Sequence, residues 1–202
     1  MLCKPRKSYW GQNDRREHTL LNWGRVARRI RVPLGFVSAA AYLWLAHPNL
    51  PAMAAGAIIA AMGLWLRALA SGHVKKNEAL ATSGPYAHTR NPLYLGSILI
   101  AVGFAVAARS WWVGFLFVAM LLAIYLPVIH SEEEFLRGRF PEFENYARDV
   151  PRLLPRLTAN PDLDGRSTFS KALYLQHREY NALLGALGMM TALAIKLVYF
   201  PR

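Results

Sequence analysis

Two short segments carry most of the polar side chains that could do chemistry in an otherwise apolar chain. "GPYAHTRNPLYLG", residues 84–96, combines two prolines and two tyrosines with a histidine, an arginine and an asparagine. "SEEEF", residues 131–135, places three adjacent glutamates after a long apolar run. Prolines stiffen the first segment, and a carboxylate beside a membrane is best retained when it meets a cation. The glutamates therefore indicate either an ion pair with Arg90 or a pocket for a cationic ligand.

Both segments also have a purely structural interpretation, which stays open at this point. Gly84-Pro85 is a turn signal, and Asn91-Pro92 is typical of a helix start. Ser131 followed three residues later by Glu134 matches a capping box, which predicts a new helix beginning at Ser131. The apolar side chains of that helix would then lie flat on the membrane surface.

Five apolar runs must position these segments. The runs cover about Val32–Ala46, Pro51–Ala70, Pro92–Ala108, Trp111–His130 and Ala182–Phe200. Helices are expected, because backbone amides in hydrocarbon need partners within their own segment, and the runs lack the alternation of a membrane barrel. The sequence predicts an all-α polytopic membrane protein of about five transmembrane helices with a cytoplasmic-face amphipathic helix. Residues 1–202 are expected to form a single membrane domain.

The positive charges are segregated from the apolar runs. Nine Lys and Arg residues lie in Met1–Arg31, three in Ser71–Pro92 and eight in Ser131–Tyr180, whereas the opposite side holds three. Positive residues favour the cytoplasmic side. The charge pattern therefore predicts an integral membrane protein with its N-terminus and both long connections in the cytoplasm and its C-terminus on the other side.

Composition excludes several other classes of protein. A hydrophobic fraction of 54% together with a net charge of +12 favours a membrane protein with basic flanks over a nucleic-acid binder. The single cysteine, Cys3, leaves no disulfide framework and no CxxC redox pair. The six histidines show no ligand spacing, and no protein-bound metal is expected.

The order of the motifs resembles a known family. Gly84-Pro85-Tyr86, residues 90–96 (RNPLYLG), Glu132-Glu133 and Val150-Pro151-Arg152 occur in the order found in isoprenylcysteine carboxyl methyltransferases. The wider group includes the membrane phospholipid methyltransferases. The resemblance covers residues 72–155, the expected cofactor-binding core. Residues 167–202 lie outside it, as an extra amphipathic helix plus a transmembrane helix in which Gly185 and Gly188 would permit close packing.

The resemblance implies an integral membrane methyltransferase that uses S-adenosylmethionine and releases S-adenosylhomocysteine. The acceptor would be lipophilic, either an isoprenoid-like carboxylate or a lipid, and would arrive from the bilayer at a cytoplasmic active site. Arg90 and Glu132 would be catalytic. The cofactor would be bound by Lys76, Leu80, Gly84, Tyr86, His88, Asn91, Pro92, Tyr94, Glu132 and Glu133.

Two departures from the family pattern keep alternatives open. Asn91 stands where the family usually has histidine, and "YLPVIH" before the glutamates lacks the arginine that holds the substrate carboxylate in eukaryotic prenylcysteine enzymes. Phospholipid or amine N-methylation with the same cofactor is a close alternative. An NADPH-dependent sterol-type reductase is disfavoured by Gly96-Ser97, where such enzymes carry an acidic residue. In a non-catalytic scaffold, Arg90 and the glutamates would form only a structural ion pair.

Overall fold

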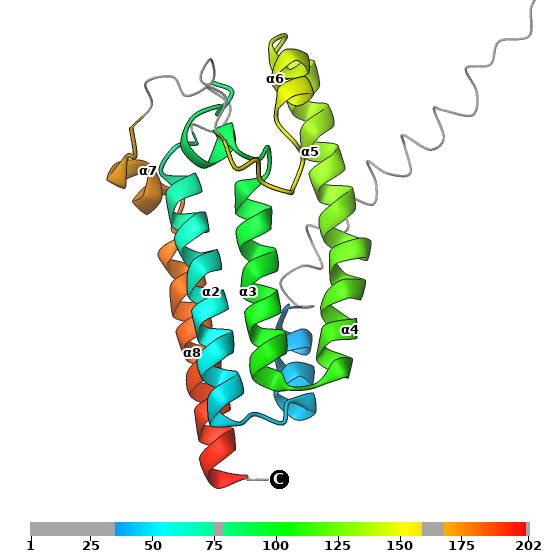
Figure 1. Cartoon of the computed structure of the whole chain (residues 1–202), viewed down its shortest axis with the longest axis vertical. Helices are drawn as coiled ribbons and strands as arrows, with labels where there is room; N and C mark the ends of the chain where they lie inside the picture. Colours follow the sequence, from blue (N-terminus) through cyan, green and yellow to red (C-terminus); the bar gives the residue numbers. More distant parts are fainter. Residues whose placement is uncertain (1–34, 75–78, 159–167, 201–202) are drawn as a thin grey trace, which may run out of the picture.

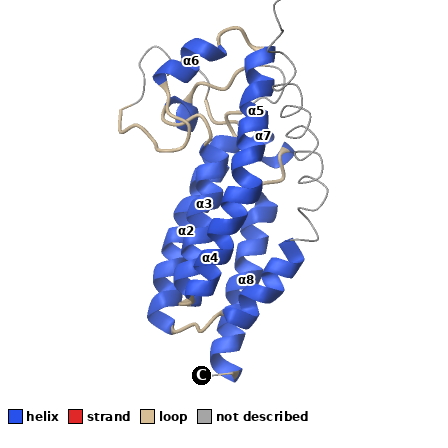
Figure 2. Cartoon of the chain, turned by 90° about the vertical axis from the view of Figure 1, so that its right-hand side faces the viewer, coloured by secondary structure: helices blue, strands red, loops and turns tan. Residues whose placement is uncertain are grey.

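The computed structural model describes residues 35–74, 79–158 and 168–200 of the chain. Within this described part the regular structure is helical and no strand occurs (Figure 2). The helices are Gly35–Leu45, α2 Leu50–Ser71, the 3-10 turn η2 Gly84–Ala87, α3 Pro92–Ala108, α4 Trp111–Met120, the π turn η3 Leu121–Tyr125, α5 Leu126–Arg139, α6 Phe143–Asp149, α7 Lys171–Gln176 and α8 Tyr180–Tyr199.

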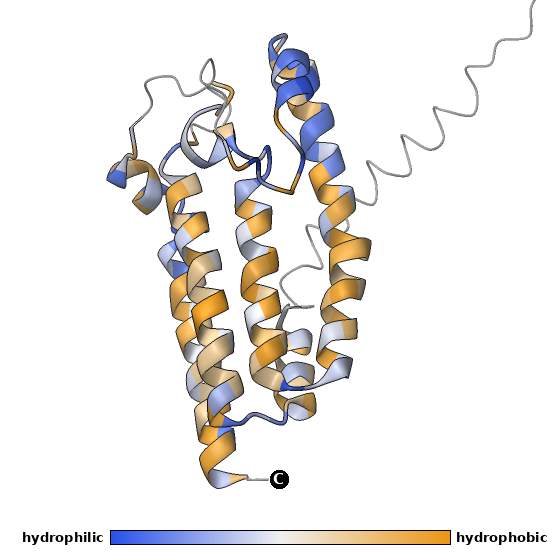
Figure 3. Ribbon diagram, viewed as in Figure 1, coloured by the Kyte–Doolittle hydropathy of each residue, from blue (hydrophilic) through white to orange (hydrophobic). Residues whose placement is uncertain are grey.

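Five apolar helical segments form the bundle that the sequence predicts. Leu50–Ser71, Trp111–Arg139 and Tyr180–Tyr199 are long and apolar enough to cross a membrane, whereas Gly35–Leu45 and Pro92–Ala108 are shorter. A hydrocarbon core takes about 20 helical residues, and the bundle helices are mostly hydrophobic along their length (Figure 3). The expected all-α polytopic membrane fold is confirmed.

Polar segments gather at one end of the bundle. The connections that follow α2 and α5 both lie at this end, together with α6 and α7, while the chain ends at the opposite end (Figure 1). The other two connections are tight hairpins. Asn49 caps α2 by accepting from the Ala52 N–H at 2.9 Å, and Arg109 ends α3 with a left-handed φ of 48°. The two chemistry-bearing segments are therefore brought to the same end.

Glycines let α2 and α3 approach closely. A Cβ on Gly56 would lie 2.3 Å from the Gly103 carbonyl oxygen, and a Cβ on Gly63 would lie 2.5 Å from the Gly96 carbonyl oxygen. By contrast, a Cβ on Gly185 or Gly188 would meet nothing within 4 Å. Small residues therefore do permit close packing in this fold, but in the α2–α3 pair rather than in the last helix, where we expected it.

Gly63→Ala is expected to destabilise the protein relative to Gly188→Ala by about 1–3 kcal/mol, the usual cost of overpacking. Both changes gain the same helix propensity, about 1 kcal/mol, but only the Gly63 methyl would press on backbone atoms. Unfolding of the detergent-solubilised variants in increasing SDS measures the difference. Equal stability of the two variants would contradict the close α2–α3 contact.

The acidic segment does not begin a new helix. α4, η3 and α5 form one continuous helix, Trp111–Arg139, and the Ser131 hydroxyl donates back to the Val128 carbonyl. The predicted capping box at Ser131 is therefore wrong. Pro127 cannot donate a backbone hydrogen bond, and the π turn that ends two residues before it absorbs the irregularity without ending the helix.

The end of α5 folds back instead of continuing along the membrane. After α5 the chain turns at Phe140 into α6, and Phe143, Tyr146 and Val150 form a buried cluster there. Leu80, from the connection after α2, packs against this cluster. Instead of the expected flat surface helix, residues 140–156 form a compact cap. This cap lies over the start of α3.

The last segment of the chain is fastened to the bundle at both ends of α8. At the polar end, Ser170 N–H and His177 Nδ1 bond the Gly72 and Ser71 carbonyls, which satisfies the end of α2. At the far end, Lys196 Nζ donates to the Leu43, Trp44 and Ala46 carbonyls at the end of the first described helix. α8 is therefore part of the bundle rather than a separate anchor.

Candidate functional site

A cavity of about 340 Å³ opens at the polar end of the bundle, between η2, α3, α5 and α6. Its size lies within the roughly 300–1,000 Å³ range of small-molecule sites. Eight of the residues predicted as catalytic or cofactor-binding line it: Leu80, Tyr86, Arg90, Asn91, Pro92, Tyr94, Glu132 and Glu133. The two motifs that are far apart in the sequence therefore meet around one space.

Glu133 is the buried hub of this site. Its side chain is 3% exposed, and Arg152 binds Oε2 through Nε at 3.0 Å and Nη2 at 2.6 Å. Asn91 Nδ2 donates to Oε1 at 3.0 Å, and Arg90 Nε lies 3.7 Å from the same oxygen. Because three side chains already surround this carboxylate, its geometry is that of a positioning residue.

Asn91 uses an amide where the family pattern has an imidazole. Its Nδ2 donates both to Glu133 and, at 3.1 Å, to the Arg152 carbonyl oxygen. The amide thus supplies two hydrogens from a single atom, whereas a neutral imidazole would supply one. Pro92 follows at the first turn of α3, where a missing N–H costs nothing. The substitution therefore preserves a hydrogen-bonding role, but not one that titrates near neutral pH.

Arg90 combines burial with an unused donor. Its side chain is 14% exposed, and its Nε is a buried atom without a hydrogen-bond partner within the described part of the chain. Burying such a donor unpaired is costly. Since Arg90 lines the cavity, its guanidinium contributes positive charge that favours an anionic group of a ligand there.

Glu132 is the carboxylate that lines the cavity without a charged partner among the described residues. Its Oε2 accepts from the Tyr94 hydroxyl at 2.8 Å. The Tyr94 ring in turn packs edge-on against Tyr125, with the ring centroids 5.9 Å apart. This tyrosine pair holds Glu132 at the cavity wall and leaves carboxylate capacity for a ligand cation.

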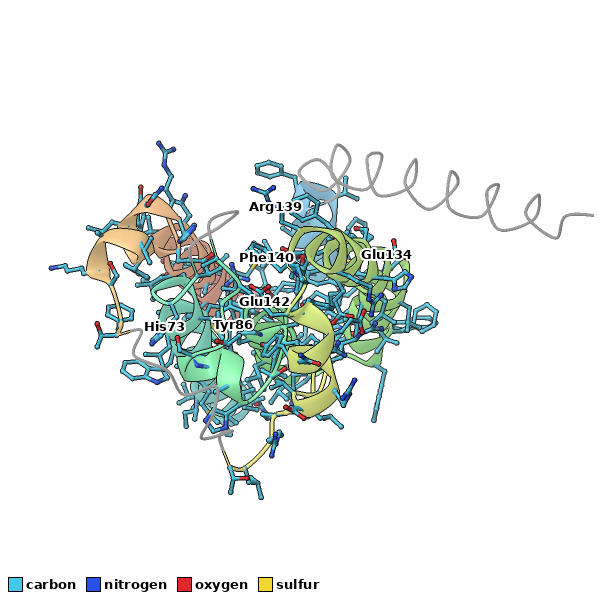
Figure 4. All side chains as sticks on the ribbon, turned by 90° about the horizontal axis from the view of Figure 1, so that it is seen from above. His73, Tyr86, Glu134, Arg139, Phe140 and Glu142 are labelled. Atoms are coloured by element: carbon cyan, nitrogen blue, oxygen red, sulfur yellow. The ribbon has the colours of Figure 1, made fainter. Side chains whose placement is uncertain are left out.

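Tyr86 forms a buried aromatic wall. The Tyr146 hydroxyl donates to the Tyr86 carbonyl oxygen at 2.8 Å, which fixes η2 against α6. Burial raises the pKa of the Tyr86 hydroxyl well above its ordinary value, and the neighbouring Tyr146 and Glu132 add to the rise. The hydroxyl therefore stays a neutral donor at physiological pH. Viewed down the bundle, Tyr86 and Phe140 lie toward the middle of this end and Glu134 toward its edge (Figure 4).

Two predicted residues support the site from outside the cavity. Gly84 adopts φ +57°, and a Cβ there would lie 2.7 Å from the His73 ring. His88 Nδ1 is 2.8 Å from the Arg156 carbonyl oxygen, while its own carbonyl accepts from the Arg156 N–H. These contacts pair the turn with residues 151–156. Lys76 lies outside the described residues.

Three functional residues were missed by sequence reasoning. Arg152 was noticed only as part of a motif, yet it is the closest partner of Glu133. Arg67 and Glu179, which also line the cavity, were not singled out as site residues. A charge inside an apolar run is the signal that could have singled out Arg67.

A second, apolar cavity lies beside the first, within the bundle. It is open on one side and has a volume of about 1040 Å³, between the first described helix, α3, α4 and α8. Arg67, Ser97 and Tyr125 line both cavities. A polar space at the bundle end thus adjoins an apolar space at membrane depth.

Comparison with known proteins agrees with this geometry. Residues 50–142 match the family model described as phospholipid methyltransferase. The resemblance to the membrane methyltransferase group is confirmed. The matched segment contains α2, α3 and the glutamates of α5, and it ends before Arg152 and Glu179.

Two curated relatives carry different names. The chain is 38% identical over 104 residues to "Cobalt-zinc-cadmium resistance protein CzcN" of Cupriavidus metallidurans, covering 51% of this chain and 47% of that protein. It is 34% identical over 116 residues to "Nickel-cobalt-cadmium resistance protein NccN" of Alcaligenes xylosoxydans xylosoxydans, covering 57% and 54%. The chain therefore spans about half the length of these relatives. No solved structure matches it.

Proposed function

We propose that this protein is an integral membrane methyltransferase that transfers the methyl group of S-adenosylmethionine to a lipophilic acceptor. The observation that carries the proposal is the cavity in which the Arg90–Tyr94 segment meets Glu132 and Glu133. The phospholipid methyltransferase match over residues 50–142 supports the reaction class.

The residues present fit this donor. Of the three carboxylates that line the polar cavity, Glu133 is paired with Arg152 and Glu179 with Arg67, so Glu132 is the carboxylate placed to meet a sulfonium or an ammonium. Glu132 offers a carboxylate for the ammonium, and the guanidinium of Arg90, which lines the cavity, offers positive charge for the carboxylate of S-adenosylmethionine. The Tyr86 ring provides a face for the sulfonium or the adenine.

Methyl transfer requires alignment of donor and acceptor and exclusion of water more than covalent participation by the protein. S-adenosylmethionine would supply an activated methyl group, and the chain would supply the geometry. Glu133 locks Asn91 and Arg152, so the turn before α3 stays rigid and holds Arg90 and Tyr94 in place. Leu136, Phe140 and Phe143 line the apolar side of the cavity and exclude water.

The apolar cavity supports a lipophilic acceptor. Its walls are formed mostly by aliphatic and aromatic side chains of bundle helices, and it adjoins the polar cavity at Arg67, Ser97 and Tyr125. An amphiphile whose tail lies there would present its head group to the methyl donor. The basic segments of the chain favour a cytoplasmic location for this end of the bundle.

The curated relatives are named for resistance to metals, which by itself says nothing about chemistry in this chain. Among the described residues, no three His, Cys, Asp or Glu side chains are grouped as a metal site requires. The proposed reaction therefore rests on the methyl-donor cavity and not on these names.

Binding of S-adenosylhomocysteine to detergent-solubilised protein tests the proposal. We expect a dissociation constant in the micromolar range, about −8 kcal/mol, by calorimetry, and no measurable binding of NADPH. Binding of NADPH alone would overturn the proposal in favour of a reductase, and binding of neither would favour a scaffold. Incubation with labelled donor and membrane lipids then distinguishes N-methylated from O-methylated products.

A further inference from the structure

Arg67 sits in a fully formed carboxylate site within the membrane bundle. Its Nε and Nη2 donate hydrogen bonds to the two carboxylate oxygens of Glu179 at 2.8–3.0 Å. Its Nη1 donates to the Ser97 hydroxyl at 2.5 Å and to the Leu93 carbonyl at 3.3 Å. The guanidinium therefore presents the paired donor geometry that carboxylates and phosphates prefer, and the chain's own carboxylate occupies it.

This ion pair lies where the two cavities adjoin. Arg67 lines both cavities, and Glu179 lines the polar one. The side chains of Arg67 and Glu179 are 23% and 13% exposed. An amphiphile with its tail in the apolar cavity would bring its head group to this point.

The Glu179 carboxylate is positioned so that it can move away from Arg67. Glu179 precedes the first residue of α8 and follows Arg178, a non-glycine residue held at φ 53°. A left-handed residue other than glycine is strained, and the break between α7 and α8 lies at the polar end, next to water. Exchange of Glu179 for another anion keeps the buried guanidinium paired, which avoids the cost of leaving it alone.

We propose that Arg67 selects the acceptor of the proposed methyltransferase by its head group, and that Glu179 is an internal plug which only an anionic head group replaces. Only the ligand's role as the methyl acceptor rests on the proposed function. The ligand site itself rests on Arg67, Glu179 and the adjoining cavities. The shared chemistry of the ligand is an apolar tail with a carboxylate or phosphate head.

Three spin-labelled probes with the same tail test the head group: stearate, stearyl phosphate and methyl stearate, in phosphatidylcholine nanodiscs. We expect wild type to prefer an anionic probe over the uncharged ester, and the stearate and phosphate arms identify which anion is favoured. Glu179→Gln removes the plug and is expected to strengthen that preference about tenfold. Arg67→Gln and the double variant Arg67→Gln/Glu179→Gln are expected to lose it.

Equal affinity for all three probes in wild type, or an unchanged preference in Arg67→Gln, would overturn the inference. Should Glu179→Gln fail to fold, Glu179→Asp keeps the charge but shortens the reach, and a stronger anion preference is again expected. S-adenosylhomocysteine should not displace stearate, since displacement would assign Arg67 to the donor. A wild type that binds no S-adenosylhomocysteine yet keeps its anion preference would sink the proposed function and leave this site standing.

Discussion

Glu133→Ala is expected to lower the free energy of unfolding by about 3–5 kcal/mol, because it leaves the largely buried Arg90 guanidinium without its counter-charge and the buried Asn91 amide without its acceptor. The Glu133 carboxylate binds Arg152 and Asn91 and lies beside Arg90. All of these partners belong to segments that close the polar end of the bundle. Much of the cap formed by residues 140–156 should therefore become mobile, and donor binding should disappear together with the folded cap.

The matched control for this change is Glu134→Gln. Glu134 is the next residue on α5, but its side chain is 47% exposed and forms an ion pair with the exposed His130. Such a surface pair contributes about 0–1 kcal/mol. Thermal unfolding followed by circular dichroism and proteolysis of the cap measures both variants. Similar stability losses in the two would show that Glu133 is not the hub.

A more conservative variant distinguishes a positioning role of Glu133 from direct contact with the methyl donor. Glu133→Gln keeps the shape and one acceptor oxygen but removes the charge, so Arg152 loses its strong partner. If Glu133 acts through Asn91 and Arg152, this variant should lose donor affinity and gain susceptibility of residues 151–156 to protease together. Loss of affinity with an undisturbed cap would instead mean that Glu133 touches the donor.

The apolar helices were predictable because each is bounded by residues with strong local preferences. Pro92 opens α3, and the predicted Pro92–Ala108 run is the helix that forms. Asn49 and Pro51 mark the start of α2 in the same way. In a membrane the hydrophobic run and the need for internal hydrogen bonds leave few other conformations.

The continuity of α4 and α5 was not predictable from the same rules. Pro127 and Ser131 both favour a helix boundary, yet the π turn Leu121–Tyr125 carries the helix through them. Tyr125, at the end of this turn, faces both cavities. Which of two locally acceptable backbones forms here is decided by packing between helices, and that information lies outside the segment.

Ion pairs between distant segments were equally hidden. Arg67 and Glu179 are 112 residues apart, so no spacing rule relates them, and Arg152 looked like one surface base among many. The sequence identified eight of the residues that line the cavity, but not which of the two glutamates of α5 is ion-paired. Glu133 is ion-paired and Glu132 is not because of the way in which the cap, residues 140–156, folds back over the start of α3.

Glu132→Gln is expected to weaken S-adenosylhomocysteine binding by about 10- to 100-fold with little change in stability, since a hydrogen bond to a charged group is worth about 1.5–3 kcal/mol. Glu132 contacts the Tyr94 hydroxyl rather than a buried cation. Its amide replacement can still accept from Tyr94, but it cannot offset the ammonium of the ligand.

Tyr94→Phe provides the comparison that isolates charge from orientation. It removes only the hydroxyl that holds Glu132, so a loss of about threefold to tenfold is expected, less than for the charge itself. Calorimetry of both variants and of Glu134→Gln at two salt concentrations completes the test. Only the loss of binding free energy caused by Glu132→Gln should become smaller at the higher salt concentration, because salt screens the charge interaction. Wild-type affinity in Glu132→Gln would remove this carboxylate from the donor site and would leave Glu179 as the remaining acidic candidate on the cavity wall.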